Sequence, residues 1–180
     1  MTDFTIVEAK PWHCGAMSRL LRHEHRNAVA VLGIDSHREL RTLFDASAYR
    51  RAWLIDGKLA GLGGVTGSEM AAIGFVWLTL TEQGTHYPIA IVKEARRLLD
   101  EIMVTKRELA TTILAGDHAA KRLAIFLGFH VSHDGPGSPA STRFARRDLA
   151  RFLDSNPELR IPIGTSYVIP MGYHHDLEAT

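Results

Sequence analysis

Asp56-Gly57 separates two runs of strand-forming residues, 49–55 and 59–65. Two-residue turns between antiparallel strands favour this dipeptide, because both of its positions need a positive φ. A third run, 72–80, is rich in isoleucine, phenylalanine, valine and tryptophan, which are common in strands. The three runs predict an antiparallel meander in the middle of the chain.

Helical and strand-like patterns surround this meander. Pro88 occupies the first position of the clearest amphipathic helix, and Ser36 with Glu39 forms an S-x-x-E capping box. The segment 83–87 is expected to be a loop. Helices are expected at 16–26, 36–46, 88–105 and 119–127, and further strands at 4–7, 109–115, 129–132 and 142–145. This mixture predicts an α/β domain.

Composition excludes several classes of protein. The 180 residues, 46% of them apolar, suffice for one domain with a buried core. The net charge of +1 argues against a protein held to nucleic acid or membrane by bulk charge, and no apolar run approaches a membrane span. No signal peptide is expected at the N-terminus. The ten histidines lack the ligand spacing of zinc sites, so no metal is expected.

Three glycines fall in the middle strand of the meander, at Gly61, Gly63 and Gly64. They leave part of that strand without side chains. Such gaps admit close approach of another backbone or a ligand, and they also accompany β-bulges. Both interpretations stay open from the sequence.

The segment 117–129 resembles the second signature of the GNAT superfamily of N-acyltransferases, which reads Asn-x-x-Ala-x-x-Leu/Phe-Tyr-x-x-x-Gly-Phe. The residues in register are Ala120, Leu123, Gly128 and Phe129. The expected order of strands and helices over residues 2–145 is also similar to that of the superfamily. The resemblance implies a GNAT-like mixed, mostly antiparallel sheet flanked by helices, with a C-terminal extension.

The resemblance also implies a site for acyl-CoA. In GNAT proteins the fourth and fifth strands splay apart, and the pantetheine arm lies along the free backbone of the fourth strand. The pyrophosphate binds amides where the next long helix begins, since unpaired N–H groups and the helix dipole favour an anion. Carried onto this sequence, the expected cofactor-binding residues are Leu78, Leu80, Gln83, Gly84, Thr85 and Asp117.

The sequence departs from the superfamily pattern at two functional places. In the loop expected to hold the pyrophosphate, His86 and Pro88 replace glycines, and Pro88 lacks an amide donor. Ala124 stands where the superfamily often has a tyrosine that protonates the leaving thiolate. The nearest candidates for a catalytic base are Glu82 and His86, and Cys14 and Glu69 are remoter ones.

Two functions follow from these departures. In the first, the chain is a GNAT-fold protein with degenerate CoA-binding and catalytic motifs, no cofactor, and a structural role in or on a phage virion. The segments 56–65 and 75–79 look like those of phage-encoded GNAT-like proteins such as the internal virion protein A of short-tailed coliphages. In the second, it is an acyl-CoA-dependent N-acetyltransferase with an atypical pyrophosphate loop and acetyl-CoA as cofactor.

The end of the chain differs in character from the rest. Residues 1–145 are expected to form the GNAT-like domain, and residues 146–180 a helix and an extended tail. Apolar residues persist among the prolines and glycines of segment 156–180, which predicts docking on other virion proteins or on a second copy of the chain. The expected location is the virion or host cytoplasm for a phage protein, and otherwise the cytoplasm.

Overall fold

The computed structural model describes residues 3–31, 33–114, 116–132, 141–147, 161–163 and 166–168. The strands are β1 (Phe4–Glu8), β2 (Ser47–Ile55), β3 (Lys58–Thr66), β4 (Ile73–Leu80), β5 (Glu108–Leu114), β6 (His130–Val131), β7 (Ser141–Arg147), β8 (Ile161–Ile163) and β9 (Ser166–Val168). The helices are α1 (Pro11–Leu20), α2 (His23–Val31), α3 (Ser36–Asp45), α4 (Glu82–Thr85), α5 (Pro88–Met103) and α6 (His118–Phe126).

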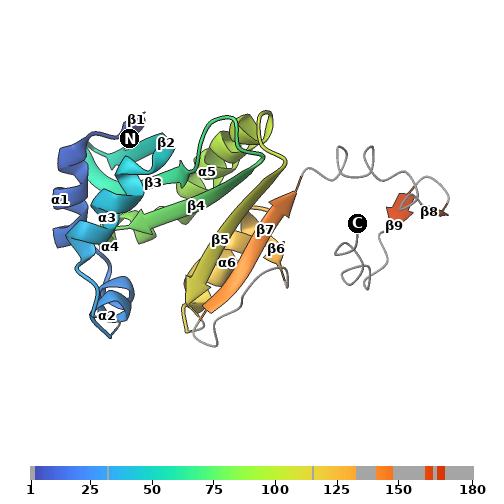
Figure 1. The fold of residues 1–180 in the computed structure, drawn as a ribbon. Helices are drawn as coiled ribbons and strands as arrows, with labels where there is room; N and C mark the ends of the chain where they lie inside the picture. Colours follow the sequence, from blue (N-terminus) through green and yellow to red (C-terminus); the bar gives the residue numbers. More distant parts are fainter. Residues whose placement is uncertain are drawn as a thin grey trace.

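Seven strands form one mixed, mostly antiparallel sheet in the order β1-β2-β3-β4-β5-β7-β6 (Figure 1). Among the described strands, β4 and β5 are the neighbours that run parallel. The expected α/β fold and its mixed sheet are therefore confirmed. β8 and β9 pair antiparallel in a separate two-stranded sheet. No helix in the described part of the chain is long and apolar enough to cross a membrane.

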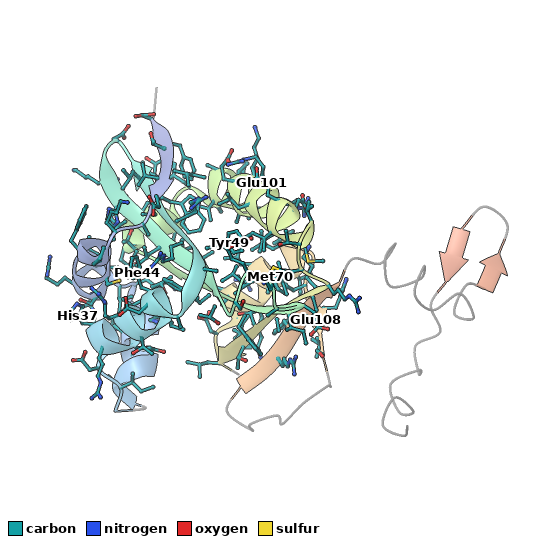
Figure 2. The ribbon with its side chains drawn as sticks, turned by 45° about the horizontal axis from the view of Figure 1, so that its top comes forward. His37, Phe44, Tyr49, Met70, Glu101 and Glu108 are labelled. Carbon is teal, nitrogen blue, oxygen red and sulfur yellow. The ribbon has the colours of Figure 1, made fainter. Side chains whose placement is uncertain are left out.

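Helices cover both faces of the seven-stranded sheet. α1 and α3 pack on one face, around Met17, Leu40 and Leu62. α5 and α6 pack on the other, in a core that contains Leu99 and Phe144. Figure 2 shows Phe44 of α3 in the first core and Tyr49 of β2, which packs against the second. The two cores follow from the alternation of side chains along each strand.

The predicted hairpin is confirmed. Asp56 and Gly57 join β2 to β3 with φ angles of 48° and 72°, as a two-residue turn of this composition requires. Pro88 is the first residue of α5, which confirms the start predicted for that helix. Both signals act locally, so a sequence carries them without help from the rest of the fold.

The single helix predicted at 16–26 is wrong. α1 ends at Leu20, and α2 begins at His23. Between them Leu21 takes an extended conformation, with ψ at 136°, and forms an isolated antiparallel bridge to Thr81. Leu21 is only 1% exposed, so its burial against the end of β4 outweighs the helical periodicity.

Two other local predictions need correction. The cap of α3 is Asp35, whose carboxylate accepts from the Arg38 amide at 2.7 Å, and Ser36 is the first helical residue instead. The expected loop after β4 contains the helical turn α4. Thr81 caps it, and that hydroxyl is the local signal for a helix start at this point.

Tryptophan side chains occupy the space left by the glycines of β3. A Cβ on Gly63 would lie 3.0 Å from the ring of Trp53, and one on Gly64 would lie 3.0 Å from the indole nitrogen of Trp77. A shift in register between Trp53 and Leu54 also marks a bulge where β2 pairs with β3. The bulge therefore lies next to Gly61. At Gly63 and Gly64 the nearest atoms are backbone carbonyl oxygens, Trp77 O at 2.8 Å and Tyr49 O at 2.5 Å from the respective Cβ positions, so close approach of a neighbouring backbone applies there.

Residues 148–160, 164, 165 and 169–180 lie outside the described part of the chain, and with them most of the extension predicted at 146–180. The division at residue 145 and the docking role of segment 156–180 stay predictions.

Candidate functional site

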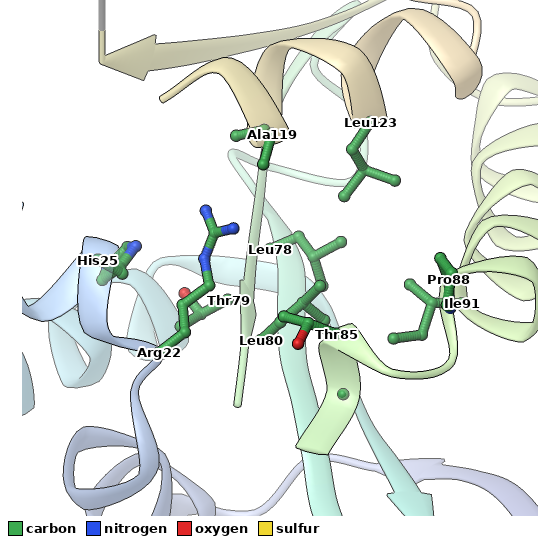
Figure 3. Close-up of a pocket in the computed structure, with 12 residues that line it drawn as sticks. Arg22, His25, Leu78, Thr79, Leu80, Thr85, Pro88, Ile91, Ala119 and Leu123 are labelled. Carbon is green, nitrogen blue, oxygen red and sulfur yellow. The ribbon is translucent and has the colours of Figure 1, made fainter. Parts of the chain in front are cut away.

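β4 and β5 lie side by side at one end and diverge toward the other (Figure 1). Among the described residues their ladder covers only Ile73–Phe75 against Glu108–Ala110. A cavity of about 170 Å³, here called the split cavity, opens where the strands have parted (Figure 3). It is lined by Arg22, His25, Leu78, Thr79, Leu80, Gly84, Thr85, Pro88, Ile91, Ala119, Ala120 and Leu123.

Backbone N–H and C=O groups of β4 point into this gap. The carbonyl of Ala72 accepts from the Glu108 amide at 3.2 Å, and the carbonyl of Leu80 accepts from the Arg22 amide at 3.4 Å. Both bonds leave β4 on the side away from β3. Because backbone direction alternates with a period of two, Leu78 faces the same side. The described part of β5 offers it no ladder partner, so its N–H and C=O are open to a ligand.

The turn after β4 uses its amides internally. The Gly84 amide donates to the Thr81 hydroxyl at 3.1 Å, the Thr85 amide to the Thr81 carbonyl at 3.3 Å, and the Tyr87 amide to the Gly84 carbonyl at 3.1 Å. A Cβ on Gly84 would lie 2.3 Å from the Ala60 carbonyl oxygen. Glycine is therefore required here for packing of α4 against β3, and these amides are already paired within the turn.

The first turn of α5 leaves its amides open. Pro88 has no N–H, and within the described chain no acceptor faces the amides of Ile89 and Ala90. Pro88 and Ile91 both line the split cavity. Unpaired amides at the positive end of a 16-residue helix favour an anion. Within the described chain, the open amides therefore lie in the first turn of α5, after the loop 83–87 in which the sequence placed them.

Arg22 and Asp117 connect the two sides of the split. Arg22 Nη2 donates to Asp117 Oδ2 at 2.5 Å, and the two side chains are 14% and 19% exposed. The other carboxylate oxygen of Asp117 accepts from the Ala120 amide at 2.9 Å and caps α6. The carboxylate thus fixes both the guanidinium beside the cavity and the start of the helix.

His25 is the ionisable side chain beside Arg22 on the wall of the split cavity (Figure 3). Burial lowers the pKa of its imidazole, the Arg22 charge lowers that pKa further, and the Asp117 carboxylate partly opposes them. The ring is therefore mainly neutral near pH 7. A neutral imidazole at a cavity wall can accept a proton from a reacting group.

The structure places most of the expected cofactor-binding residues around one cavity. Those that line it are Leu78, Leu80, Gly84 and Thr85. Asp117 does not line the cavity, but it forms an ion pair with Arg22, which does. Gln83 is not among the lining residues. The role of these residues toward a cofactor stays a prediction.

The candidate bases named from the sequence lie elsewhere. Glu82 Oε1 accepts from the His23 amide at 2.8 Å, so it satisfies a free amide at the start of α2. His86 is exposed, and neither residue lines the split cavity. Their catalytic role stays a prediction without geometric support.

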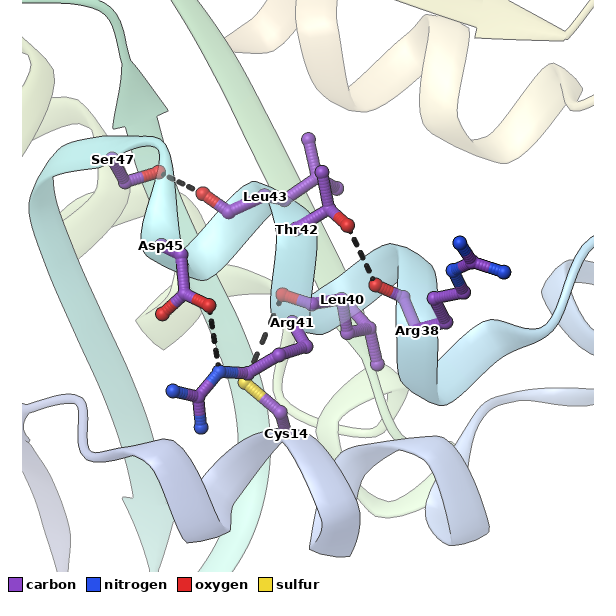
Figure 4. A network of polar contacts seen from close by, with 8 residues as sticks. All are labelled: Cys14, Arg38, Leu40, Arg41, Thr42, Leu43, Asp45 and Ser47. Carbon is purple, nitrogen blue, oxygen red and sulfur yellow. Dashed lines mark hydrogen bonds and ion pairs between the residues drawn. The ribbon is translucent and has the colours of Figure 1, made fainter.

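The two remoter candidates, Cys14 and Glu69, lie away from the split cavity. Cys14 is fully buried, and its thiol points at the Leu40 carbonyl at 3.7 Å (Figure 4). Burial raises the pKa of this thiol, which keeps it protonated. The backbone carbonyl of Glu69 accepts a hydrogen bond from Lys106 Nζ at 2.9 Å. Neither residue lines the split cavity.

Sequence reasoning missed Arg22 and His25. No spacing rule links residue 22 to residue 117, because 95 positions separate them and the pair forms only once α2 and α6 are in place. The His23-Glu24-His25 cluster was visible, but its residues point in different directions on a helix. The signal that distinguishes His25 is burial, which the sequence does not carry.

Comparison with solved structures identifies the fold. PaiA N-acetyltransferase from Thermoplasma acidophilum, in complex with coenzyme A, matches with a TM-score of 0.58 and 12% identity, over 81% of this chain and 99% of that one. Aminoglycoside acetyltransferase AAC(6')-Ib, also with coenzyme A, matches with a TM-score of 0.60 and 11% identity, over 86% of this chain and 99% of that one. This chain has the GNAT acetyltransferase fold.

A third example with the GNAT fold contains the acyl donor. YncA from Salmonella typhimurium, with its cofactor acetyl-CoA, matches with a TM-score of 0.53 and 16% identity, over 80% of this chain and 93% of that one. No protein-family model matches the sequence, and no curated protein matches it. At these identities the likeness concerns the fold.

Proposed function

We propose that this chain is an acyl-CoA-dependent N-acyltransferase. One observation carries the proposal: Leu78, whose backbone is open, lines a cavity in the β4–β5 split, and the open amides of Ile89 and Ala90 lie between two other residues that line it, Pro88 and Ile91. Three solved structures of the same fold hold coenzyme A or acetyl-CoA. The sequence favoured a structural protein without a cofactor, whereas the present proposal is an enzyme that uses acyl-CoA.

The residues present fit such a cofactor. Leu78 offers a donor and an acceptor to the amides of a pantetheine arm, as an added strand would. Ile89 and Ala90 offer amides to a pyrophosphate. Ile91 and Leu123 supply apolar walls between these positions. When bound, the cofactor would supply an acyl group activated as a thioester.

His25 is the proposed catalytic base. An amine acceptor enters as an ammonium ion near neutral pH and must lose a proton before it can attack. A ring nitrogen of His25 takes that proton, because the imidazole is neutral and lies on the cavity wall. Arg22, fixed by Asp117, keeps the imidazole from holding a proton before substrate arrives.

No observation favours the phage structural role over the enzymatic one. The three solved structures compared above are acetyltransferases by name and were determined with coenzyme A or acetyl-CoA. The sequence departures at His86 and Pro88 are accommodated by moving the anion-binding position into α5.

Calorimetric titration with acetyl-CoA tests the proposal. We expect saturable binding and a matching rise in the melting temperature, equivalent to about 2.7 kcal/mol of stability at 100-fold excess over Kd. Turnover is then measured as release of the free thiol of CoA, with a panel of small amines and peptide N-termini as candidate acceptors. Absence of both heat and thermal shift at millimolar acetyl-CoA would refute the proposal.

A further inference from the structure

The start of α1 is closed by a histidine side chain. Lys10 precedes the helix in an extended conformation, with φ at −119° and ψ at 157°, and Pro11 is the first helical residue. The backbone amide of Lys10 donates to Nδ1 of His13 at 2.8 Å. His13 therefore occupies the position, three residues after the cap, at which a capping box has glutamate or glutamine.

This hydrogen bond determines which nitrogen of the imidazole carries the proton. A backbone N–H can only donate, so Nδ1 of His13 must present its lone pair. The proton of the neutral ring is then on Nε2. An imidazolium has a proton on both nitrogens, and its Nδ1–H would face the N–H of Lys10. Protonation of His13 and the bond to Lys10 therefore exclude each other.

The surroundings of His13 also disfavour its protonation. Burial lowers the pKa of His13 below its ordinary value of 6.5, and the charge of Lys10, which binds Glu8 at 2.7 Å, lowers that pKa further. An imidazolium would also lie at the positive end of α1. The other charged or titratable side chains near this end of α1 are Arg50 and Arg51 of β2, which act on Glu8, Arg41 and Asp45 of α3, which act on Cys14, and Arg19 and His37, which approach Gly15.

The first turn of α1 covers the sulfur of Cys14. Cys14 follows His13 directly and is fully buried, with its thiol facing the Leu40 carbonyl of α3 at 3.7 Å (Figure 4). Met17, three residues later, is buried in the same core. An unwound first turn would therefore uncover Cys14. It is the one cysteine of the sequence, so its reactivity reports such unwinding.

We propose that His13 is a pH-sensitive switch at the first turn of α1. The neutral imidazole accepts from the Lys10 amide and closes the turn. In mildly acidic solution, protonation removes this acceptor, releases the turn and uncovers Cys14. His13, Lys10 and Cys14 do not line the split cavity, so the inference stands without the proposed acyl transfer.

Thermal melting of the full chain at about pH 7.5 and about pH 5 tests the switch. His13→Gln is the matched variant, because glutamine at this position also accepts from the cap amide and does not titrate. The unfolded chain protonates His13 more readily than the folded chain does, so the original chain loses stability as pH falls below 6.5. We expect its melting temperature to fall by about 2–4 °C more than that of His13→Gln. His37→Gln, which removes an exposed histidine of α3, should keep the pH dependence of the original chain.

Reaction of Cys14 with 4,4′-dithiodipyridine, a thiol reagent that also reacts in mild acid, measures release of the first turn. The labelling rate of the original chain is divided by that of His13→Gln, which cancels the pH dependence of the thiol itself. We expect this ratio to rise about fivefold or more between about pH 7.5 and about pH 5. His13→Ala, which lacks the acceptor, should react about fivefold faster than His13→Gln at both pH values.

¹⁵N NMR of the His13 ring observes the proton directly. At about pH 7.5 we expect it on Nε2 and none on Nδ1, with the His13 signals identified by their loss in His13→Gln. A proton on Nδ1 at this pH would overturn the proposal. So would an equal pH dependence of melting in the original chain and in His13→Gln, or a labelling ratio that does not change with pH.

Discussion

Arg22 Nη2 lies 2.5 Å from Asp117 Oδ2, and this ion pair joins two parts of the chain that the sheet leaves apart. Arg22 precedes α2, whereas Asp117 caps α6. The β4–β5 ladder has ended before this point, so the pair spans the open end of the split. It sets the distance between the wall that carries His25 and the helix that forms the opposite wall.

Replacement of Asp117 should destabilise the fold. Asp117→Ala removes both the ion pair and the cap of α6, and we expect a loss of about 2 kcal/mol in the free energy of unfolding. Urea denaturation measures it. Arg41→Gln is the control, because its pair with Asp45 is exposed and should contribute nothing measurable. Equal effects of the two substitutions would contradict the importance of the spanning pair.

The pH dependence of acyl transfer should report His25. Burial lowers the pKa of His25 below its ordinary value of 6.5, so the ring stays neutral at pH 7 and takes up a proton only in more acidic solution. We therefore expect kcat/KM to fall as pH drops below 6.5. Removal of a general base costs about 100-fold or more, so His25→Gln should lower kcat by that factor with acetyl-CoA affinity nearly unchanged.

Arg22→Gln supplies the matched control for this assignment. The Arg22 charge lowers the pKa of His25, so its removal should move the acid limb of the kcat/KM profile to higher pH. The assignment to His25 would be contradicted if the acid limb of the kcat/KM profile did not move in Arg22→Gln. It would also be contradicted if the same limb were still present in His25→Gln.

A carboxylate at the start of α5 should weaken binding of acetyl-CoA without unfolding the chain. Ile89 is 83% exposed, so Ile89→Glu removes no core contact, and its charge suits the positive end of the helix. The same charge repels a pyrophosphate at the open amides. We expect affinity to fall about tenfold, with stability unchanged or slightly higher. Calorimetry of the neutral Ile89→Gln should show affinity close to that of the original chain.

Gly84 should be intolerant of a side chain for a packing reason. Its Cβ would lie 2.3 Å from the Ala60 carbonyl, whereas a Cβ on Gly116 meets nothing within 4 Å. We expect Gly84→Ala to lower the free energy of unfolding by about 3 kcal/mol, and Gly116→Ala to leave it almost unchanged. Similar melting temperatures for the two variants would show that α4 moves away from β3 without cost.

Local signals in the sequence predicted much of the sheet. The Asp56-Gly57 turn, the meander and the start of α5 at Pro88 depend on residues within a few positions of each other. The break between α1 and α2 depends instead on Leu21, which is buried against Thr81, 60 positions away. Periodicity over one segment contains no information about such a contact.

The candidate site was predicted in outline through the expected splay of the strands. Leu78 and Leu80 lie on the cavity as expected, since their place on β4 follows from the strand assignment. Gly84 and Thr85 were expected to offer open amides, but the hydroxyl and the carbonyl of Thr81 accept from them, and the sequence did not reveal this cap. His25 was missed because its place on the cavity wall depends on residues far away in the sequence, such as Leu78 and Ala119.

Hydrogen exchange at the Leu78 amide tests the central claim most directly. In the free chain this amide should exchange quickly for a residue within a strand, since β5 provides it no partner. With saturating acetyl-CoA we expect exchange at Leu78, Ile89 and Ala90 to slow by about tenfold or more. Unchanged exchange at all three amides, with acetyl-CoA demonstrably bound, would place the cofactor elsewhere and contradict the account.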